Sequence, residues 1–249
     1  MIIIKSPREI NKMEQASKIV AETHAYLQEK IAPGITTEEI NKLGEQYIKQ
    51  QGARPSFKGY RGYPASVCIS INQEVVHGIP SAERRLKNGD IVSLDIGAFY
   101  KGFHGDAART IPVGEVGPEA TLLIETTEEA FKEGLNQART GNRLTDISHA
   151  IQTCARSNGF SVVREYVGHG IGSKMHEDPQ IPNFGPPGRG PVLKKGMTLA
   201  IEPMLNVGTY KVKTLEDRWT VVTGDGSLSA HYENTIALTS GKPLVLSEI

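Results

Sequence analysis

Apolar residues recur at helical spacing in two stretches of the first 52 residues. The segment Ser6-Pro7-Arg8-Glu9 predicts a helix start, because Ser can cap, Pro fits the first helical position and Glu completes a capping box. We expect this helix to run until Pro33-Gly34 stops it. A second helix is predicted from Thr36-Thr37 to Gly52. The apolar stripes are Ile10, Met13, Val20 and Leu27 in the first helix and Ile40, Leu43, Tyr47 and Ile48 in the second.

The second half of the chain repeats this plan. A helix from about Pro118 to Arg139 and another from about Thr145 to Gly159 flank a turn at Gly141. Each helix pair is followed by glycine-rich strand segments that contain His-Gly-Ile. We therefore predict an α+β protein with a single domain, 1–249, made of two pseudo-symmetric halves, about 1–115 and 116–249. The halves should share one bent antiparallel sheet, covered by the helix pairs, and one core.

Two aspartates lie in a predicted hairpin. Residues 90–100 alternate like a strand, Lys101-Gly102 can form the turn, and 103–112 can return antiparallel. Asp95 and Asp106 are an odd number of positions apart, so this hairpin places them on one face, roughly 5–8 Å apart. Two such charges in an apolar strand need a cation between them or another partner. A metal ion and an ion pair with Arg109 both fit the hairpin alone.

Three later residues favour the metal. His169 is flanked by glycines that allow close backbone approach. Glu202 ends an apolar run before Pro203, and Glu233 precedes another apolar strand. Four carboxylates and one imidazole suit two divalent ions, such as Mn, Fe, Co or Zn, because a single ion would leave excess negative charge.

Composition excludes several other classes of protein. The chain has 28 Lys+Arg and 28 Asp+Glu, so its net charge is zero and gives no electrostatic reason to expect nucleic acid or a membrane surface as a partner. Only two cysteines occur, too few for a disulfide framework. The apolar start is too short for a signal peptide, and nowhere do about 18 apolar residues run together. We therefore expect a cytoplasmic protein.

Several motifs together resemble the type I methionine aminopeptidases. The similarity covers essentially the whole chain, and the motifs occur in the family's order. The absence of a Cys/His-rich extension and the short interval between His169 and Glu202 resemble the short bacterial form. The motifs are Asn72–Pro80, Ser93–Gly97, Gly105–Thr110, Gly168–Gly172, Ile201–Pro203 and Tyr232–Thr235.

The resemblance implies the pita-bread fold and a role for each site residue. Asp95 would chelate one metal ion, His169 with Glu202 would hold the other, and Asp106 and Glu233 would bridge both. Glu202 would also help to shuttle the proton of the metal-bound water.

Two further histidines and an apolar pocket follow from the same resemblance. His77 and His176 match histidines that contact the scissile peptide, where a developing oxyanion and a departing amine need a donor. For His176, pairing with Glu177 or Asp178 is the alternative interpretation. The residues that would wall a methionine side chain are Tyr60, Tyr63, Cys68 and Trp219.

The implied activity is removal of N-terminal methionine from nascent polypeptides by a metal-bound hydroxide, preferably before a small second residue. Such a substrate implies transient work near the ribosome, and we expect a monomer. One alternative is a proline-specific peptidase of the same fold, and another is a pita-bread binding module without metals. Both remain open here, although the module would be expected to have lost some of the five ligands.

Overall fold

The computed structural model describes residues 1–248, and the capping box predicted at Ser6 is present in it, with a second one at Thr36. Ser6 and Thr36 each accept a hydrogen bond from the backbone N–H three residues later, and the Glu at that position reaches back to the cap. Two helix pairs result, with a single 3-10 turn at Tyr60–Gly62. The helices are α1 (Pro7–Gln28), α2 (Thr37–Gln50), α3 (Pro118–Gln137) and α4 (Leu144–Ser157).

The first helix ends earlier than the sequence pattern predicted. It stops at Gln28, several residues before Pro33. The following segment is used in tertiary hydrogen bonds instead, because Gly34 donates to the Leu86 carbonyl and Leu86 donates to that of Ile35. Gly34 also has a φ of +97°, which a helix cannot accommodate. The other three helices lie within a few residues of their predicted bounds.

The predicted hairpin is confirmed. Strands β4 (Ile91–Tyr100) and β5 (Phe103–Pro112) pair antiparallel along their whole length. Lys101 and Gly102 both have positive φ, 49° and 88°, as a two-residue type I′ turn requires.

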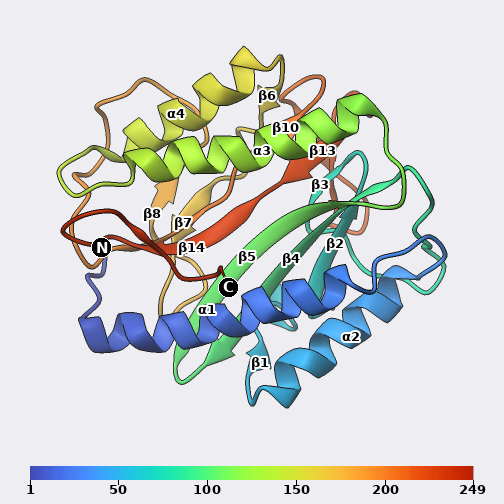
Figure 1. Cartoon of the computed structure of the whole chain (residues 1–249), viewed down its shortest axis with the longest axis horizontal. Coiled ribbons are helices and arrows are strands. Elements are labelled where there is room, and N and C mark those ends of the chain that lie inside the picture. Colours follow the sequence, from blue (N-terminus) through green and yellow to red (C-terminus); the bar gives the residue numbers. More distant parts are fainter. Residues whose placement is uncertain (249) are drawn as a thin grey trace.

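One antiparallel sheet extends through both halves of the chain (Figure 1). Its path is β1-β4-β5-β14-β9-β7-β8, with β2 on β4 and β15 on β14. Two smaller sheets have the orders β13-β10-β6 and β11-β12-β3. The remaining strands are β1 (Arg54–Pro55), β2 (Val67–Ile71), β3 (Glu74–Val76), β6 (Ser161–Val162), β7 (Gly168–Gly170), β8 (Glu177–Ile181), β9 (Thr198–Ile201), β10 (Met204–Asn206), β11 (Val212–Thr214), β12 (Val221–Thr223), β13 (Ser229–His231), β14 (Glu233–Ala237) and β15 (Leu244–Val245).

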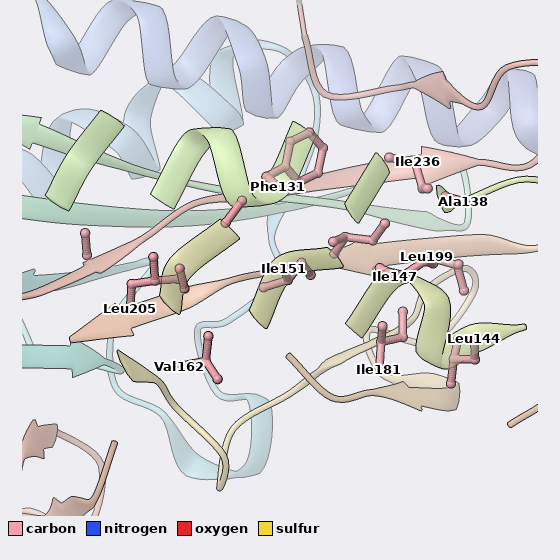
Figure 2. Packing of buried hydrophobic residues seen from close by; sticks show 14 of the residues in the cluster. Phe131, Ala138, Leu144, Ile147, Ile151, Val162, Ile181, Leu199, Leu205 and Ile236 are labelled. Atoms are coloured by element: carbon pink, nitrogen blue, oxygen red, sulfur yellow. The ribbon is translucent and has the colours of Figure 1, made fainter. Parts of the chain in front are cut away.

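The apolar core is divided, so the expectation of one shared core is wrong. The larger cluster packs α3 and α4 against the sheet, and it includes Phe131 and Ile151 from the helices and Leu199 and Ile236 from the strands (Figure 2). A second cluster packs α1 and α2 against β2, β4 and β5. Between α1 and α3 lies a cavity of about 460 Å³ whose lining includes polar groups, among them Arg109. These polar groups interrupt the apolar packing.

Cys68 and Cys154 are both free thiols. None of the helices in residues 1–248 combines the length and hydropathy that crossing a lipid bilayer requires.

Candidate metal centre and active site

Five strands that are neighbours in the large sheet each supply one of the predicted ligands. The order β4-β5-β14-β9-β7 is continuous in the sheet, and β4, β5 and β14 lie side by side in Figure 1. The side chains are Asp95 on β4, Asp106 on β5, Glu233 on β14, Glu202 directly after β9, and His169 on β7.

The strand register places these side chains on one face. Ala108 is opposite Asp95 on one side and opposite Glu233 on the other. Because directly opposed residues share a face, and Asp106 is two positions from Ala108, all three carboxylates point the same way. The predicted placement of Asp95 and Asp106 on one face is therefore confirmed, and the register makes the two residues diagonal neighbours.

His169 faces two of the carboxylates through one nitrogen. Its Nε2 lies 3.9 Å from Asp106 Oδ2 and 3.6 Å from Glu202 Oε1. Its Nδ1 is 2.8 Å from the Gly170 carbonyl and so carries the proton, which leaves the Nε2 lone pair free. Both Nε2 distances are too long for hydrogen bonds but suit atoms that share a cation.

Burial makes the carboxylate cluster costly without a cation. It raises the pKa of Asp95 to about 7 and the pKa values of Asp106, Glu202 and Glu233 well above their ordinary range, with neighbouring carboxylates adding to the effect in the last three. One oxygen each of Asp95, Asp106 and Glu233 is fully buried without a hydrogen-bond partner. Unpaired oxygens aimed at a common centre fit a divalent metal.

Arg109 does not neutralise the two aspartates, so the ion-pair alternative is wrong. Its guanidinium donates to the main-chain carbonyls of Ala108, Glu233 and Ser247 and to Asn234 Oδ1, and it lies over the Tyr232 ring. Arg109 therefore holds β14 and the C-terminal segment behind the site.

The two other predicted histidines border the same cluster. His176 Nδ1 lies 2.9 Å from the Tyr60 hydroxyl, and its ring lies against that of His169, with centroids 4.2 Å apart. The alternative interpretation, in which His176 pairs with Glu177, is wrong, because Glu177 forms an ion pair with Lys5 instead. Burial lowers the pKa values of His77 and His176 to about 4, so both are neutral at pH 7.

All eleven predicted site residues line a single cavity of about 140 Å³. Its apolar side is a cluster that includes Tyr63, Cys68, Tyr60 and Trp219. Tyr63 donates to the Gly78 carbonyl at 2.8 Å, and its ring meets Trp219 edge-on.

The structure adds residues that the sequence interpretation did not assign to the site. Phe57, Arg61 and Met175 also line the cavity. His231, at the end of β13, has its Nε2 3.7 Å from Glu202 Oε2. Its position two residues before Glu233 was the available signal, but His231 ends β13 whereas Glu233 begins β14, so the alternation of side chains along one strand does not relate them.

Comparisons with known proteins agree with this geometry. The model of metallopeptidase family M24 matches residues 11–240. A methionine aminopeptidase of Clostridium acetobutylicum is 58% identical over 247 residues, which cover 99% of both chains. The crystal structure of a methionine aminopeptidase from Thermotoga maritima has a TM-score of 0.98 and 48% identity, with full coverage of both chains. A prolidase from Pyrococcus furiosus has a TM-score of 0.81 and 25% identity, and the match covers 99% of this chain but 66% of the prolidase.

Proposed function

The chain belongs to metallopeptidase family M24 and, within it, to the methionine aminopeptidases, and we propose that it removes N-terminal methionine from nascent polypeptides whose second residue is small. It is a pita-bread enzyme that depends on divalent metal ions. The observation that carries the proposal is the convergence of four carboxylates and one imidazole from five adjacent strands beside an apolar cavity.

Two divalent ions would be held by the five converging side chains. The unpartnered buried oxygens of Asp95, Asp106 and Glu233 support metal binding, since each needs a positive partner, and two ions would balance the charge of four carboxylates better than one. When bound, such ions supply Lewis acidity toward the scissile carbonyl and activate water at neutral pH. Asp95 would bind one ion, His169 and Glu202 the other, and Asp106 and Glu233 both. Co, Mn, Fe and Zn all accept this donor set.

Glu202 is well placed to move a proton. Its side chain is 13% exposed, compared with 8% for His169, 4% for Asp106 and 2% for Glu233, so it is more open to the cavity than these three ligands. Asn183 donates to the Glu202 carbonyl and fixes the strand end. Glu202 would accept a proton from the attacking water and deliver it to the leaving amine.

His77 and His176 would contact the substrate peptide. Both line the cavity, and neutral imidazoles can donate a hydrogen bond to a developing oxyanion. His77 lies edge-on to Trp219 and Tyr166, and the Tyr60 hydroxyl orients His176.

The apolar side of the cavity suits an unbranched thioether. Tyr60, Tyr63, Cys68 and Trp219 would surround the methionine side chain, where sulfur–aromatic contacts add to apolar burial. Burial raises the pKa of the Cys68 thiol well above its ordinary value, so Cys68 would act as an apolar wall and not as a nucleophile.

A nascent-chain substrate would require the enzyme to work where polypeptides emerge. We expect transient work near the ribosome in the cytoplasm, by a monomer, without direct binding of nucleic acid. The zero net charge and the two free thiols support this setting.

Methionine release from Met-Ala-Ser tests the proposal. Metal-stripped protein should be inactive, and added Co²⁺ or Mn²⁺ should restore activity. Glu202→Ala should lose metal affinity and activity, whereas His77→Ala should keep the metals, measured by calorimetry, and lose activity. Glu125→Gln is the control, because it removes an exposed carboxylate on α3.

The substrate range separates the alternatives. Met-Ala peptides should be cleaved much faster than Met-Lys peptides, and equal rates would contradict the size rule. Cleavage of only Xaa-Pro peptides would indicate a proline peptidase. A folded protein that binds no metal and cleaves nothing would indicate a binding module.

A further inference from the structure

A second buried imidazole faces the carboxylate cluster. His231 is 1% exposed, and its Nε2 lies 3.7 Å from Glu202 Oε2 and 3.9 Å from Glu233 Oε2. Donor atoms of these three residues all lie within 4.8 Å of one another. The set has the composition and the spacing of a metal-binding group.

The position of His231 repeats that of His169. The Nε2 atom of each imidazole lies between two carboxylates. It is 3.6 and 3.9 Å from the nearest carboxylate oxygens in His169, and 3.7 and 3.9 Å from them in His231. The two oxygens of Glu202 are divided between them, Oε1 toward His169 and Oε2 toward His231. Glu202 is therefore flanked by imidazoles on both sides.

His231 Nε2 is an unpartnered polar atom. It is fully buried and has no hydrogen-bond partner among the described residues, and the carboxylate oxygens are beyond hydrogen-bond distance. Leaving such a nitrogen unpaired is unfavourable, whereas a cation beside Glu202 and Glu233 would satisfy it.

The backbone of His231 is fixed in this position. Thr110 Oγ1 donates to the His231 carbonyl at 2.9 Å and accepts from its N–H at 2.8 Å. Ser93 Oγ lies 2.8 Å from the same Thr110 hydroxyl, which ties this contact to β4 and β5. The backbone of His231 is thus tied to the strands that carry Asp95 and Asp106.

We propose that His231 is a further metal ligand, which with Glu202 and Glu233 forms a second imidazole-containing face of the centre. The inference rests on the metal centre proposed above. A second imidazole favours Co²⁺, Ni²⁺ and Zn²⁺ over Mn²⁺, since carboxylate-rich sites suit Mn²⁺ and imidazole suits the later metals. His231 would therefore shift the metal preference of this enzyme.

The substitution His231→Gln distinguishes metal ligation by residue 231 from hydrogen bonding by it. An amide can still donate a hydrogen bond to Glu202, but it is a poor metal ligand. In His231→Gln we expect the affinity for Co²⁺, measured by calorimetry, to fall about tenfold or more, in the range that changes around metal sites produce. The affinity for Mn²⁺ should fall less, and the visible Co²⁺ absorption spectrum should change.

His24→Gln is the matched control. His24 is also buried, but its Nε2 lies 2.9 Å from the Ala107 carbonyl, and His24 belongs to neither of the candidate metal-binding groups found among the described residues. This variant should keep the Co²⁺ spectrum and the ratio of Co²⁺ to Mn²⁺ affinities. A similar change in His24→Gln would overturn the assignment, because the effect would then be general.

A measurement on the wild-type protein tests the same inference without requiring that His231→Gln folds. NMR of the cobalt-loaded enzyme should show paramagnetically shifted ring N–H resonances from two ligating imidazoles. A single ligating imidazole, or an unchanged Co²⁺ affinity and spectrum in His231→Gln, would overturn the inference about His231 while leaving the centre intact. A wild-type protein that binds no cobalt would overturn both the centre and the inference.

Discussion

Lys5 and Glu177 form an ion pair in which each side chain is only 3% exposed, and the pair ties the start of the chain to the loop that carries His176. The Lys5 N–H donates to the Gly196 carbonyl at 2.8 Å, and Glu177 Oε1 accepts from the Lys174 N–H at 3.2 Å. The position of His176, a proposed catalytic imidazole, thus depends on Lys5, which lies far from it in the sequence.

Removing one partner of this pair should destabilise the protein and slow catalysis. Lys5→Met leaves an uncompensated buried carboxylate, which costs about 3–5 kcal/mol. Urea unfolding should show this loss, and kcat should fall because the loop around His176 loosens. Lys132→Met is the control, since the Lys132–Glu128 pair is about half exposed and should contribute at most about 1 kcal/mol. Equal effects of the two substitutions would contradict this interpretation.

Asp106→Asn should change stability in opposite directions with and without metal. In metal-free protein the substitution removes a buried charge from a repulsive cluster, so the melting temperature should rise. With Co²⁺ or Mn²⁺ present, the variant should lose stabilisation by the bound ion, and its melting temperature should fall below that of the wild type. Thermal unfolding of the variant and the wild type, once in chelator and once in excess metal, measures both changes in melting temperature. A decrease in both conditions would indicate a purely structural role.

Local chemistry allowed the helices and the hairpin to be predicted from the sequence. The caps at Ser6 and Thr36 act over three residues, and Lys101-Gly102 fixes the register of β4 and β5. Because side chains alternate between the two faces of a strand, that register alone is enough to place Asp95 and Asp106 on the same face.

Pairing between distant segments could not be predicted in the same way. Arg109 lies close in sequence to Asp106, which made an ion pair plausible, but its guanidinium binds main-chain carbonyls of β14 and the C-terminal segment. Glu177 likewise pairs with Lys5 and not with its neighbour His176. His231 was not assigned to the site because its role depends on how the end of β13 meets Glu202.

Gly78→Ala should impair activity through the backbone. A Cβ at Gly78 would lie 2.2 Å from the Ile69 carbonyl oxygen, so the chain must shift. The preceding residue, His77, has a φ of +62° and would move with it. We expect lower kcat/KM for Met-Ala-Ser and a lower melting temperature. Gly117→Ala is the control, because its φ is −70° and its Cβ would meet open space. Full activity in Gly78→Ala would contradict the proposed role of His77.

The acid sensitivity of folding should depend partly on His24. Burial lowers the pKa of this imidazole from an ordinary value of 6.5 to about 3. Between these pH values the unfolded chain binds a proton at His24 that the folded chain does not. The contribution of neutral His24 to stability is therefore complete above pH 6.5 and is lost as the pH falls toward 3.

His24→Gln should remove this part of the pH dependence, because Gln does not titrate and its amide can still donate to the Ala107 carbonyl. Between pH 7.5 and pH 5 the wild type should lose about 2 kcal/mol more unfolding free energy than the variant, since one pKa unit corresponds to about 1.4 kcal/mol. Urea unfolding of metal-free protein at both pH values measures the difference, and the other buried histidines are present in both proteins. Parallel pH profiles would mean that His24 is protonated or accessible in the folded state.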